Sequence, residues 1–519
     1  MRLRSFGERL AEHAAVRGEQ TALDFLAEDG RETRLSWRAL DDMVNRAARV
    51  LANLGASQGH VVGFALRNSP LHIALTLAIW RLGATTFNFD PKLPAHVAQT
   101  LLRHAGASIC IHENETDGMI GCAVFEDAVM AQAATPLPNL VSCPGKILMS
   151  GGSTGMPKLM ADDQPYLRSP GRSWGNVAPS LGFRPNQVQL MSASLSHNAG
   201  LTWAQNGLFE GQHLVLFEKF DAARVLTAID RFKVEFVLTV PTMLVRMLDR
   251  LPASGAYLHS LAALYHTAGP CPPWLKERWM QILGPERVFE MYGSGENTGQ
   301  TVISGQEWLL HRGSVGRGFE TRIRIRDAAG TLLPSHEVGE VFMLPDDIQG
   351  RSRYIGPDAP APRRDEEGYQ SVGDAGWLDE DGYLYLAGRC DDAINTGGLT
   401  VHPERVEAEL IRLDAVRDVV VFGVDSREWG QSVAALVVLK AGHLSTAPKD
   451  LIAACSGRLS PEEVPRIIEF RDALPRDGFG KIRRKALQLE FNETLRARGN
   501  IPSAAARSPE DFREGLSTA

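Results

Sequence analysis

A glycine- and hydroxyl-rich segment after residue 149 has the composition of a phosphate-binding loop. It follows a short apolar run, Ile147 to Met149, that predicts a buried strand, and it ends in Pro157 and Lys158. Glycines let backbone N–H groups turn toward an anion, hydroxyls add donors, and the lysine supplies compensating charge. The segment differs from the Walker A pattern, because a proline precedes the lysine and no Ser or Thr follows it. The loop donors would come from Ser150, Gly151, Gly152, Ser153, Thr154 and Gly155.

Five further segments with chemically useful residues follow this loop along the chain. Each combines glycines with charged, polar or aromatic side chains. They are Tyr292–Glu296, Gly373–Asp374, Gly388–Asp392, Gly397–Gly398 and Leu474–Ile482, the last of which contains Lys481.

The order and content of these six segments resemble the adenylate-forming superfamily, which includes acyl-CoA synthetases, adenylation domains of peptide synthetases and beetle luciferases. The resemblance covers nearly the whole chain, and an ordered series is far more specific than any single motif. It implies an α/β fold in which residues 1–390 form a large N-terminal AMP- and acyl-binding domain of stacked doubly wound sheets. Residues 391–519 would form a small, mobile α+β lid domain that rotates about a hinge at Asp391.

The resemblance also implies a two-step reaction that uses ATP and coenzyme A. A carboxylate attacks the α-phosphate of ATP, pyrophosphate leaves, and the thiol of CoA then displaces AMP from the acyl-adenylate. The phosphate loop and Lys158 would hold the β- and γ-phosphates, and Lys481 would bridge the carboxylate and the α-phosphate. Glu296 would bind Mg²⁺, an ion that prefers oxygen ligands.

Other matched residues would bind the nucleoside and the thiol substrate. Asp374 would accept both ribose hydroxyls, because a carboxylate offers two acceptor oxygens, and Arg389 would also contact the ribose. After rotation about the hinge, Gly397 and Gly398 would line the pantetheine channel, where glycine allows close backbone approach. His197 would gate or position the acyl group at the mouth of its pocket. The adenine pocket would be formed by Ala268, Gly269, Pro270, Tyr292, Gly293, Ser294 and Gly295.

The chain departs from the family pattern at two positions. The residue before the glutamate is normally Thr, whose hydroxyl meets the α-phosphate, and this chain has Gly295 there. Val372 also stands where Thr is usual. One lost hydrogen bond to a charged group corresponds to about 1.5–3 kcal/mol, or about one to two decades in rate. These departures leave open a thioesterification-only enzyme that receives a preformed acyl-adenylate from a separate adenylating enzyme.

Three segments, of which Tyr265–Trp274 would pack the adenine and one wall of the acyl pocket, are similar to bile-acid-type CoA ligases and related actinobacterial acyl-CoA synthetases. They are Lys158–Leu159, Tyr265–Trp274 and His311–Arg317. Those relatives favour bulky, apolar, often polycyclic acids. The resemblance therefore implies a steroid-like, terpenoid or long acyl acid, and a role in lipid or terpenoid metabolism such as an actinomycete antibiotic pathway.

Three other functions remain open. An amino-acid adenylation domain would bind the substrate ammonium with an Asp shortly after the Ser196–Gly200 segment, and we find no such acid. A luciferase-type oxygenase would need an aromatic luciferin pocket. A nucleotide-binding pseudoenzyme would be compatible with Gly295, whereas Lys481, Asp374 and the Gly397–Gly398 pair together favour an enzyme that turns over.

Composition and charge narrow the partner classes. The 519 residues are 44% hydrophobic and 23% charged, which is typical of a globular protein, and the net charge of −7 argues against nucleic acid as the main partner.

The longest apolar helical run, Leu71 to Leu82, is well short of the roughly 20 residues that span a bilayer. The charged start lacks the apolar region of a signal peptide, and the six cysteines lie far apart, as free thiols in a reducing compartment would. We expect a cytoplasmic enzyme with no membrane span and no structural zinc, and a homodimer remains open.

Helical and strand patterns alternate along the chain and favour parallel sheets. Ser69 and Pro70 predict the start of a helix that Gly83 ends. The Pro-, Asp- and Arg-rich stretch Leu344–Gln370 predicts a long surface loop. Helices are also expected at 222–231, 403–413 and 449–458, and a further helix begins at residue 241. Strands are expected at 235–240, 382–386, 419–424 and 434–439.

Overall fold

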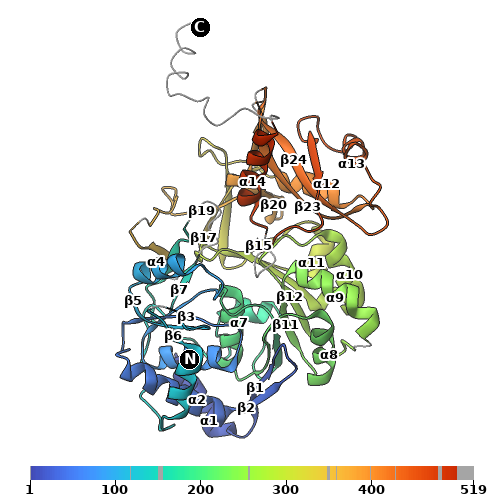
Figure 1. Cartoon of the computed structure of the whole chain (residues 1–519). Coiled ribbons are helices and arrows are strands. Elements are labelled where there is room, and N and C mark those ends of the chain that lie inside the picture. Colours follow the sequence, from blue (N-terminus) through green and yellow to red (C-terminus); the bar gives the residue numbers. More distant parts are fainter. Residues whose placement is uncertain are drawn as a thin grey trace.

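The structure, a computed structural model, describes residues 2–116, 118–149, 156–254, 257–347, 351–357, 359–397, 399–426, 428–476 and 482–498, with the backbone alone at 252–254. Two large sheets build the N-terminal part of the chain, and a smaller sheet with its own helices builds the C-terminal part, drawn at the top of Figure 1.

The larger sheet contains 13 described strands and combines parallel and antiparallel pairs. Strands β13, β12, β11, β9, β10 and β1 are parallel neighbours. Strand β2 pairs antiparallel at one edge, and an antiparallel region continues from β13 toward the other edge. The strands are β1 (Thr21–Leu26), β2 (Glu32–Ser36), β9 (Val188–Met191), β10 (His213–Phe217), β11 (Phe236–Thr239), β12 (Ala263–His266), β13 (Val288–Gly293), β14 (Gln300–Ser304), β15 (Gly316–Gly318), β16 (Thr321–Arg326), β17 (Gly339–Pro345), β19 (Gln370–Leu378) and β20 (Tyr383–Arg389).

The second sheet contains seven described strands in the order β18-β8-β7-β4-β3-β5-β6. The five from β7 to β6 are parallel, and β8 and β18 continue the sheet in antiparallel pairs. They are β3 (Val61–Ala65), β4 (Thr85–Asn88), β5 (Ala107–His112), β6 (Ile120–Gly121), β7 (Lys146–Met149), β8 (Leu159–Ala161) and β18 (Arg353–Ile355).

The helices lie between and around these sheets, and the largest apolar cluster contains residues from both of them together with α2, α3 and α7. Helix α3 is apolar on all sides, as expected for a helix buried between two sheets. The described helices are α1 (Phe6–Arg17), α2 (Trp37–Asn53), α3 (Pro70–Arg81), α4 (Ala95–Ala105), α5 (Cys122–Met130), α6 (Val177–Ser180), α7 (Asn198–Phe209), α8 (Ala222–Phe232), α9 (Pro241–Ser254), α10 (Pro273–Leu283), α11 (Gly305–Leu310), α12 (Pro403–Ile411), α13 (Pro448–Cys455) and α14 (Arg484–Ala497).

The C-terminal sheet is covered on both faces, and the alternation of side chains along its strands explains how. In β23, Val419 and Val421 pack with α12 and α13, whereas Val420 and Phe422 pack with α14. Successive side chains of a strand point to opposite faces, so a continuous apolar run supplies two cores. The strands are β21 (Ile394–Thr396), β22 (Leu399–Val401), β23 (Val416–Ser426), β24 (Gly430–Leu439) and β25 (Ile467–Phe470).

Most of the expected elements are confirmed, including α3 with Ser69 as its N-cap and the antiparallel pair β23–β24. Two expectations were wrong in part. The stretch Leu344–Gln370 is not only a surface loop, because it contains β18, which pairs with β8, and a buried Tyr369. The sheets are also not purely parallel, since the strands from β14 to β20 pair antiparallel. Among the described residues, no helix is long and apolar enough to cross a membrane.

Candidate functional site

One cluster of predicted residues joins the ends of β13 and β20 to the middle of β19. Asp374 lies opposite Arg389 in the β19–β20 pair, and Arg389 Nη1 donates to Asp374 Oδ1 at 2.9 Å. Tyr292 donates its hydroxyl proton to Oδ2 of the same carboxylate. Burial raises the pKa of Tyr292 well above its usual value, and the negative charge of Asp374 raises it further. The phenol therefore stays protonated, and the carboxylate is held between a cation and a hydroxyl donor.

Gly373 allows the arginine to come this close. Its φ of +73° lies in the left-handed region that favours glycine. A Cβ at this position would also lie 2.9 Å from Arg389 Nη2, which is closer than a Cβ atom normally comes to another residue, so the arginine side chain would have to shift. The left-handed conformation at position 373 therefore favours glycine immediately before Asp374.

The loop after β12 lies beside the end of β13. Thr267 Oγ1 donates to the carbonyl oxygen of Met291 at 2.8 Å, which fixes the loop to the neighbouring strand. Ala268 follows with a φ of +71°, and Gly269 and Pro270 come next. Because β12 and β13 are parallel, this loop and the Tyr292–Glu296 segment lie at the carboxyl ends of the strands, where α/β sheets bind ligands.

Glu296 is held by a strand from a distant part of the chain. In β18, Tyr354 pairs with Met160 of β8, and its hydroxyl donates to Glu296 Oε1 at 2.6 Å. The backbone N–H of Ser352 donates to the Glu296 carbonyl oxygen at 3.0 Å. Lys158 Nζ, just before β8, lies 5.8 Å from the centroid of the Tyr354 ring. One tyrosine therefore contacts both the expected metal carboxylate and the expected phosphate lysine.

Neither space nor backbone conformation requires a glycine at position 295. The φ of Gly295 is outside the left-handed region. A Cβ there would lie 3.4 Å from Met160 Sδ, which is ordinary van der Waals contact with a flexible side chain. A Cβ at this position would therefore meet neither backbone strain nor a clash.

The start of α7 is tied to the strand that leads into the phosphate loop. His197 is the N-cap residue of α7. Lys146, the first residue of β7, donates through Nζ to Asn198 Oδ1 at 2.6 Å and to Thr202 Oγ1 at 2.7 Å. Burial lowers the pKa of Lys146 to about 7. These contacts position the helix end that carries His197.

Asp391 lies in a short 3₁₀ turn, Cys390–Asp392, between β20 and the C-terminal sheet. Arg484, the first residue of α14, binds the end of this turn. Its Nη1 donates to Asp392 Oδ2 at 2.6 Å and to Glu404 Oε1 at 2.7 Å. The described chain that follows Lys481 is thus fixed to the residue beside the expected hinge.

The remaining predicted residues are placed as follows. Gly397 is an exposed residue of the C-terminal part: its φ is +58°, and its N–H donates to the Trp429 carbonyl oxygen at 2.9 Å. The phosphate-loop residues 150–155, Gly398 and Lys481 lie outside the described residues.

A single carboxylate, Glu296, fits a magnesium ion that is bound mainly through nucleotide phosphates. Such ions use one or two carboxylates and complete an octahedral shell with phosphate oxygens and water. Within the described ranges, no group of three or more His, Cys, Asp and Glu side chains could hold a metal by itself. Glu296 would therefore supply the protein carboxylate, and the ion would neutralise phosphate charge.

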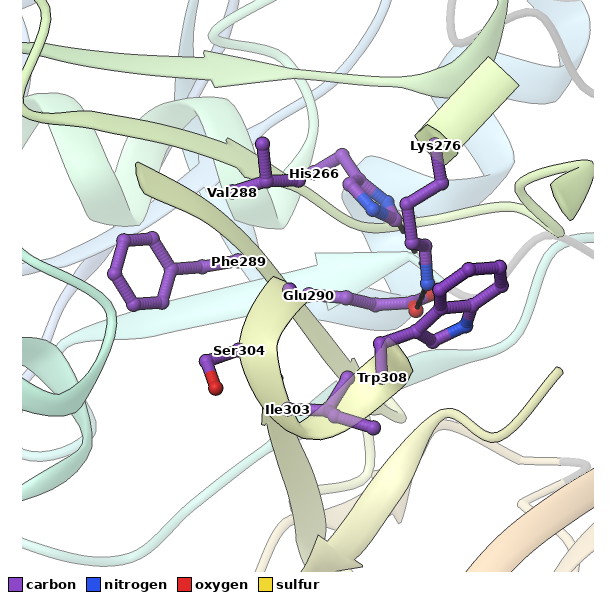
Figure 2. Close-up of a pocket in the computed structure, with 9 residues that line it drawn as sticks. His266, Lys276, Val288, Phe289, Glu290, Ile303, Ser304 and Trp308 are labelled. Atoms are coloured by element: carbon purple, nitrogen blue, oxygen red, sulfur yellow. Dashed lines mark hydrogen bonds and ion pairs between the residues drawn. The ribbon is translucent and has the colours of Figure 1, made fainter. Parts of the chain in front are cut away.

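A second cluster of charged side chains, around Glu290 of β13, lies in the core (Figure 2). Lys276 of α10 and Glu290 of β13 form an ion pair at 3% and 5% exposure, and Lys276 Nζ lies 4.9 Å from the Trp308 ring centroid. His266 Nδ1 is 3.9 Å from Glu290 Oε1, and burial lowers the His266 pKa to about 4, so the ring is neutral. Side chains fill this space and leave no room for a ligand. We interpret the pair as structural.

Comparison with known proteins identifies the family. The AMP-binding enzyme model matches residues 10–344, and the model of the AMP-binding enzyme C-terminal domain matches residues 405–481. The chain belongs to the AMP-binding enzyme family. The adenylate-forming superfamily expected from the motifs is thereby confirmed.

Curated relatives of this AMP-binding enzyme are similar over nearly their full length. A 2-succinylbenzoate–CoA ligase of a Geobacillus species is 28% identical over 461 residues, which cover 86% of this chain and 91% of the relative. The long-chain-fatty-acid–CoA ligase FadD13 of Mycobacterium tuberculosis is 26% identical over 522 residues, which cover 95% of this chain and 100% of the relative.

Solved structures share the fold. The o-succinylbenzoate CoA synthetase MenE of Bacillus subtilis, in complex with its acyl-adenylate intermediate, matches with a TM-score of 0.80 and 23% identity over 94% of this chain and 99% of that chain. ATP-bound MatB of Rhodopseudomonas palustris matches with a TM-score of 0.80 and 21% identity over the same shares. The expected α/β fold class, with a large N-terminal and a smaller C-terminal domain, is confirmed.

The sequence interpretation missed Tyr354, although this residue contacts Glu296. Tyr354 lies within the polar stretch Leu344–Gln370, where neighbouring prolines and acids favour a loop. The triplet Arg353–Ile355, with two strand-favouring residues, was the available signal. The buried partners Lys276 and Glu290 were also missed, because charged side chains rarely indicate a core position.

Proposed function

We propose that this AMP-binding enzyme is an acid–thiol ligase that makes an acyl-CoA thioester from a carboxylic acid, ATP and CoA through an acyl-adenylate. The observation that carries the proposal is the cluster of Tyr292, Asp374 and Arg389, which joins the carboxyl end of β13 to β19 and β20, with Glu296 in the segment that follows β13. A carboxylate aligned by a guanidinium suits the two hydroxyls of a ribose. The named CoA ligases among the relatives support the same reaction class.

The two halves of the reaction would use different residues. Lys481 would serve adenylation, with Mg²⁺ held by Glu296 and the triphosphate held by the phosphate loop and Lys158. Rotation about Asp391 would then bring Gly397 and Gly398 to the site for the thioester step. This places the domain boundary at residues 390 and 391, and the contact of Arg484 with Asp392 would carry the hinge movement to the lysine segment.

The substrate we propose is a bulky, apolar acid, as the pocket segments of the sequence suggest. The reaction would take place in the cytoplasm. A panel of polycyclic, terpenoid, long-chain and aromatic acids, incubated with protein, ATP, Mg²⁺ and CoA, tests the proposal. We expect AMP and acyl-CoA to form in equal amounts with one acid class. Hydrolysis of ATP to ADP, or no thioester with any acid of the panel, would contradict it.

Gly295 favours a second candidate, an enzyme that only converts preformed acyl-adenylate to thioester. Gly295→Thr decides between the two, because the site has room for the side chain. We expect a rise in pyrophosphate release of up to about 10- to 100-fold, the value of one hydrogen bond to a charged group. Gly295→Ala is the matched control, since it fills the space without a hydroxyl. If the wild type releases no pyrophosphate and the variant remains inactive, the second candidate is the better one.

Asp374→Asn is expected to weaken AMP binding by about 10- to 100-fold, because the amide loses the charge and one of two acceptor oxygens. Calorimetry with AMP measures this change. The analogue 2′,3′-dideoxy-AMP is the control, because it lacks both hydroxyls and should bind the variant and the wild type alike. An equal loss for both nucleotides would mean that Asp374 does not act through the ribose.

A further inference from the structure

We propose that Tyr354 is a positioning residue for the adenylation half-reaction: its hydroxyl fixes the Glu296 carboxylate for the metal, and its ring supports Lys158 beside the phosphates. The proposal rests on the proposed function, since it concerns the same ATP site. Its basis is the contact of one side chain with two charged groups, at 2.6 Å from the Tyr354 hydroxyl to Glu296 Oε1 and 5.8 Å from Lys158 Nζ to the ring centroid.

The strand that carries Tyr354 is fixed at several points. Its three residues pair with β8, the strand that follows Lys158. Arg353 makes a two-pronged ion pair with Asp163, with distances of 2.8 and 3.0 Å. Ser352 binds the backbone of Glu296. Tyr354 is therefore part of a short strap that joins the Glu296 segment to the end of the phosphate-loop region.

The hydroxyl can act on the metal through Glu296. A carboxylate that binds a metal needs a partner to hold its orientation, and removal of such a partner typically costs about 10- to 100-fold in metal affinity or activity. The Tyr354 hydroxyl donates to one oxygen of the carboxylate, Glu296 Oε1, and so holds the orientation of that carboxylate.

The ring makes a separate contribution. An ammonium near an aromatic face is attracted by it, and the observed distance lies within the range of about 6 Å for this interaction. A lysine side chain has many rotamers, so an aromatic surface beside it favours a smaller set of positions. The ring would thus keep Lys158 near the site of the β- and γ-phosphates without requiring the metal.

Tyr354 also bears on the departure at Gly295. Its strand partner Met160 is the residue nearest to a Cβ built at that glycine, so the tyrosine and the glycine flank the same side chain. The family threonine would bring a hydroxyl on the residue before Glu296. In this chain Tyr354 of β18 brings a hydroxyl to Glu296 itself.

Two variants separate the hydroxyl from the ring. Tyr354→Phe keeps the ring, and Tyr354→Leu removes both. Binding of a fluorescent ATP analogue is measured against Mg²⁺ concentration and again in EDTA. For Tyr354→Phe we expect the half-saturating Mg²⁺ concentration to rise about 10- to 100-fold, with unchanged binding in EDTA. For Tyr354→Leu we expect an added loss of about two- to fivefold in EDTA, the scale of an exposed cation–aromatic contact.

Tyr385→Phe is the matched control, because it removes a tyrosine–carboxylate hydrogen bond, 3.2 Å to Asp379, that does not involve Glu296. We expect this control to bind Mg²⁺ and ATP as the wild type does. Thermal melting of all variants shows whether the fold is kept. A Tyr354→Phe protein with wild-type Mg²⁺ dependence, or a control with the same shift, would overturn the proposal.

A double-mutant cycle tests whether Tyr354 acts through Glu296. In a Glu296→Gln background, Tyr354→Phe should change Mg²⁺ dependence by less than about twofold, because residues that act as a unit are not additive. The same shift in both backgrounds would contradict the proposal. These binding measurements need no carboxylic acid. Suppose that the wild type binds Mg²⁺ and ATP, that Tyr354→Phe weakens this binding, and that no thioester forms. This result would reject the proposed function and leave the role of Tyr354 standing.

Discussion

Lys481→Ala is expected to lower pyrophosphate release from ATP and acid by about 10²- to 10³-fold, while thioester formation from synthetic acyl-adenylate and CoA stays within about twofold. The reason is electrostatic: the ammonium would stabilise charge that develops between the carboxylate and the α-phosphate, and one such donor has about this effect on rate. In the second half-reaction the bond between the carboxylate and the α-phosphate is already formed and pyrophosphate has left, so this charge does not develop again. Stopped-time assays of each half-reaction measure the two rates separately.

Lys485→Ala is the matched control, because Lys485 lies four residues further along and belongs to the first turn of α14. It removes the same charge from the same segment, and both half-reactions should be nearly unchanged. An equal loss from the two variants would indicate a general effect of net positive charge. An equal loss in both half-reactions of Lys481→Ala would mean that the lysine does not act in adenylation alone.

Lys276→Met is expected to destabilise the N-terminal part by about 3–5 kcal/mol, because it leaves Glu290 as an unpaired buried charge. Methionine nearly preserves the volume and keeps contact with the Trp308 ring, so the loss would come from charge and not from a cavity. The ion pair lies beside His266 of β12, and Figure 2 shows Glu290, Lys276 and His266 together in this part of the core. Urea unfolding followed by tryptophan fluorescence measures the effect.

The double variant Lys276→Met/Glu290→Met separates pairing from packing. Replacing both members of a buried ion pair by apolar residues is often neutral or stabilising. We therefore expect the double variant to recover most of the lost stability. If it is less stable than Lys276→Met, the carboxylate of Glu290 has a favourable role without its lysine partner, and the interpretation as a structural ion pair would be wrong.

The sequence could predict the features that depend on local patterns. Pro70 after Ser69, with the following apolar residues, indicated α3, and the apolar runs at 419–424 and 434–439 indicated the strands β23 and β24. The family motifs also indicated that Asp374 and Arg389 belong to one site. The structure places the two side chains in direct contact, and their roles toward a nucleotide stay a prediction.

The remaining features depend on pairings between distant segments. Strand β18 has only three residues, and its partner β8 lies almost 200 positions earlier, so no local period marks the pairing. The ion pair of Lys276 and Glu290 joins a helix to a strand whose buried face a sequence pattern would assign to apolar residues. The contact of Tyr354 with Glu296 follows from such long-range geometry, which explains why the polar stretch around it was interpreted as a loop.

The most direct test of the central claim is an assay that follows both half-reactions on one preparation of the wild-type protein. One arm measures pyrophosphate release from ATP with the panel of bulky apolar acids, and the other measures acyl-CoA formation from the matching synthetic acyl-adenylate and CoA. We predict activity in both arms with the same acid class, which would mean that the chain completes the ligase reaction despite Gly295. Thioester formation without pyrophosphate release would contradict this account and would show that another protein supplies the adenylate.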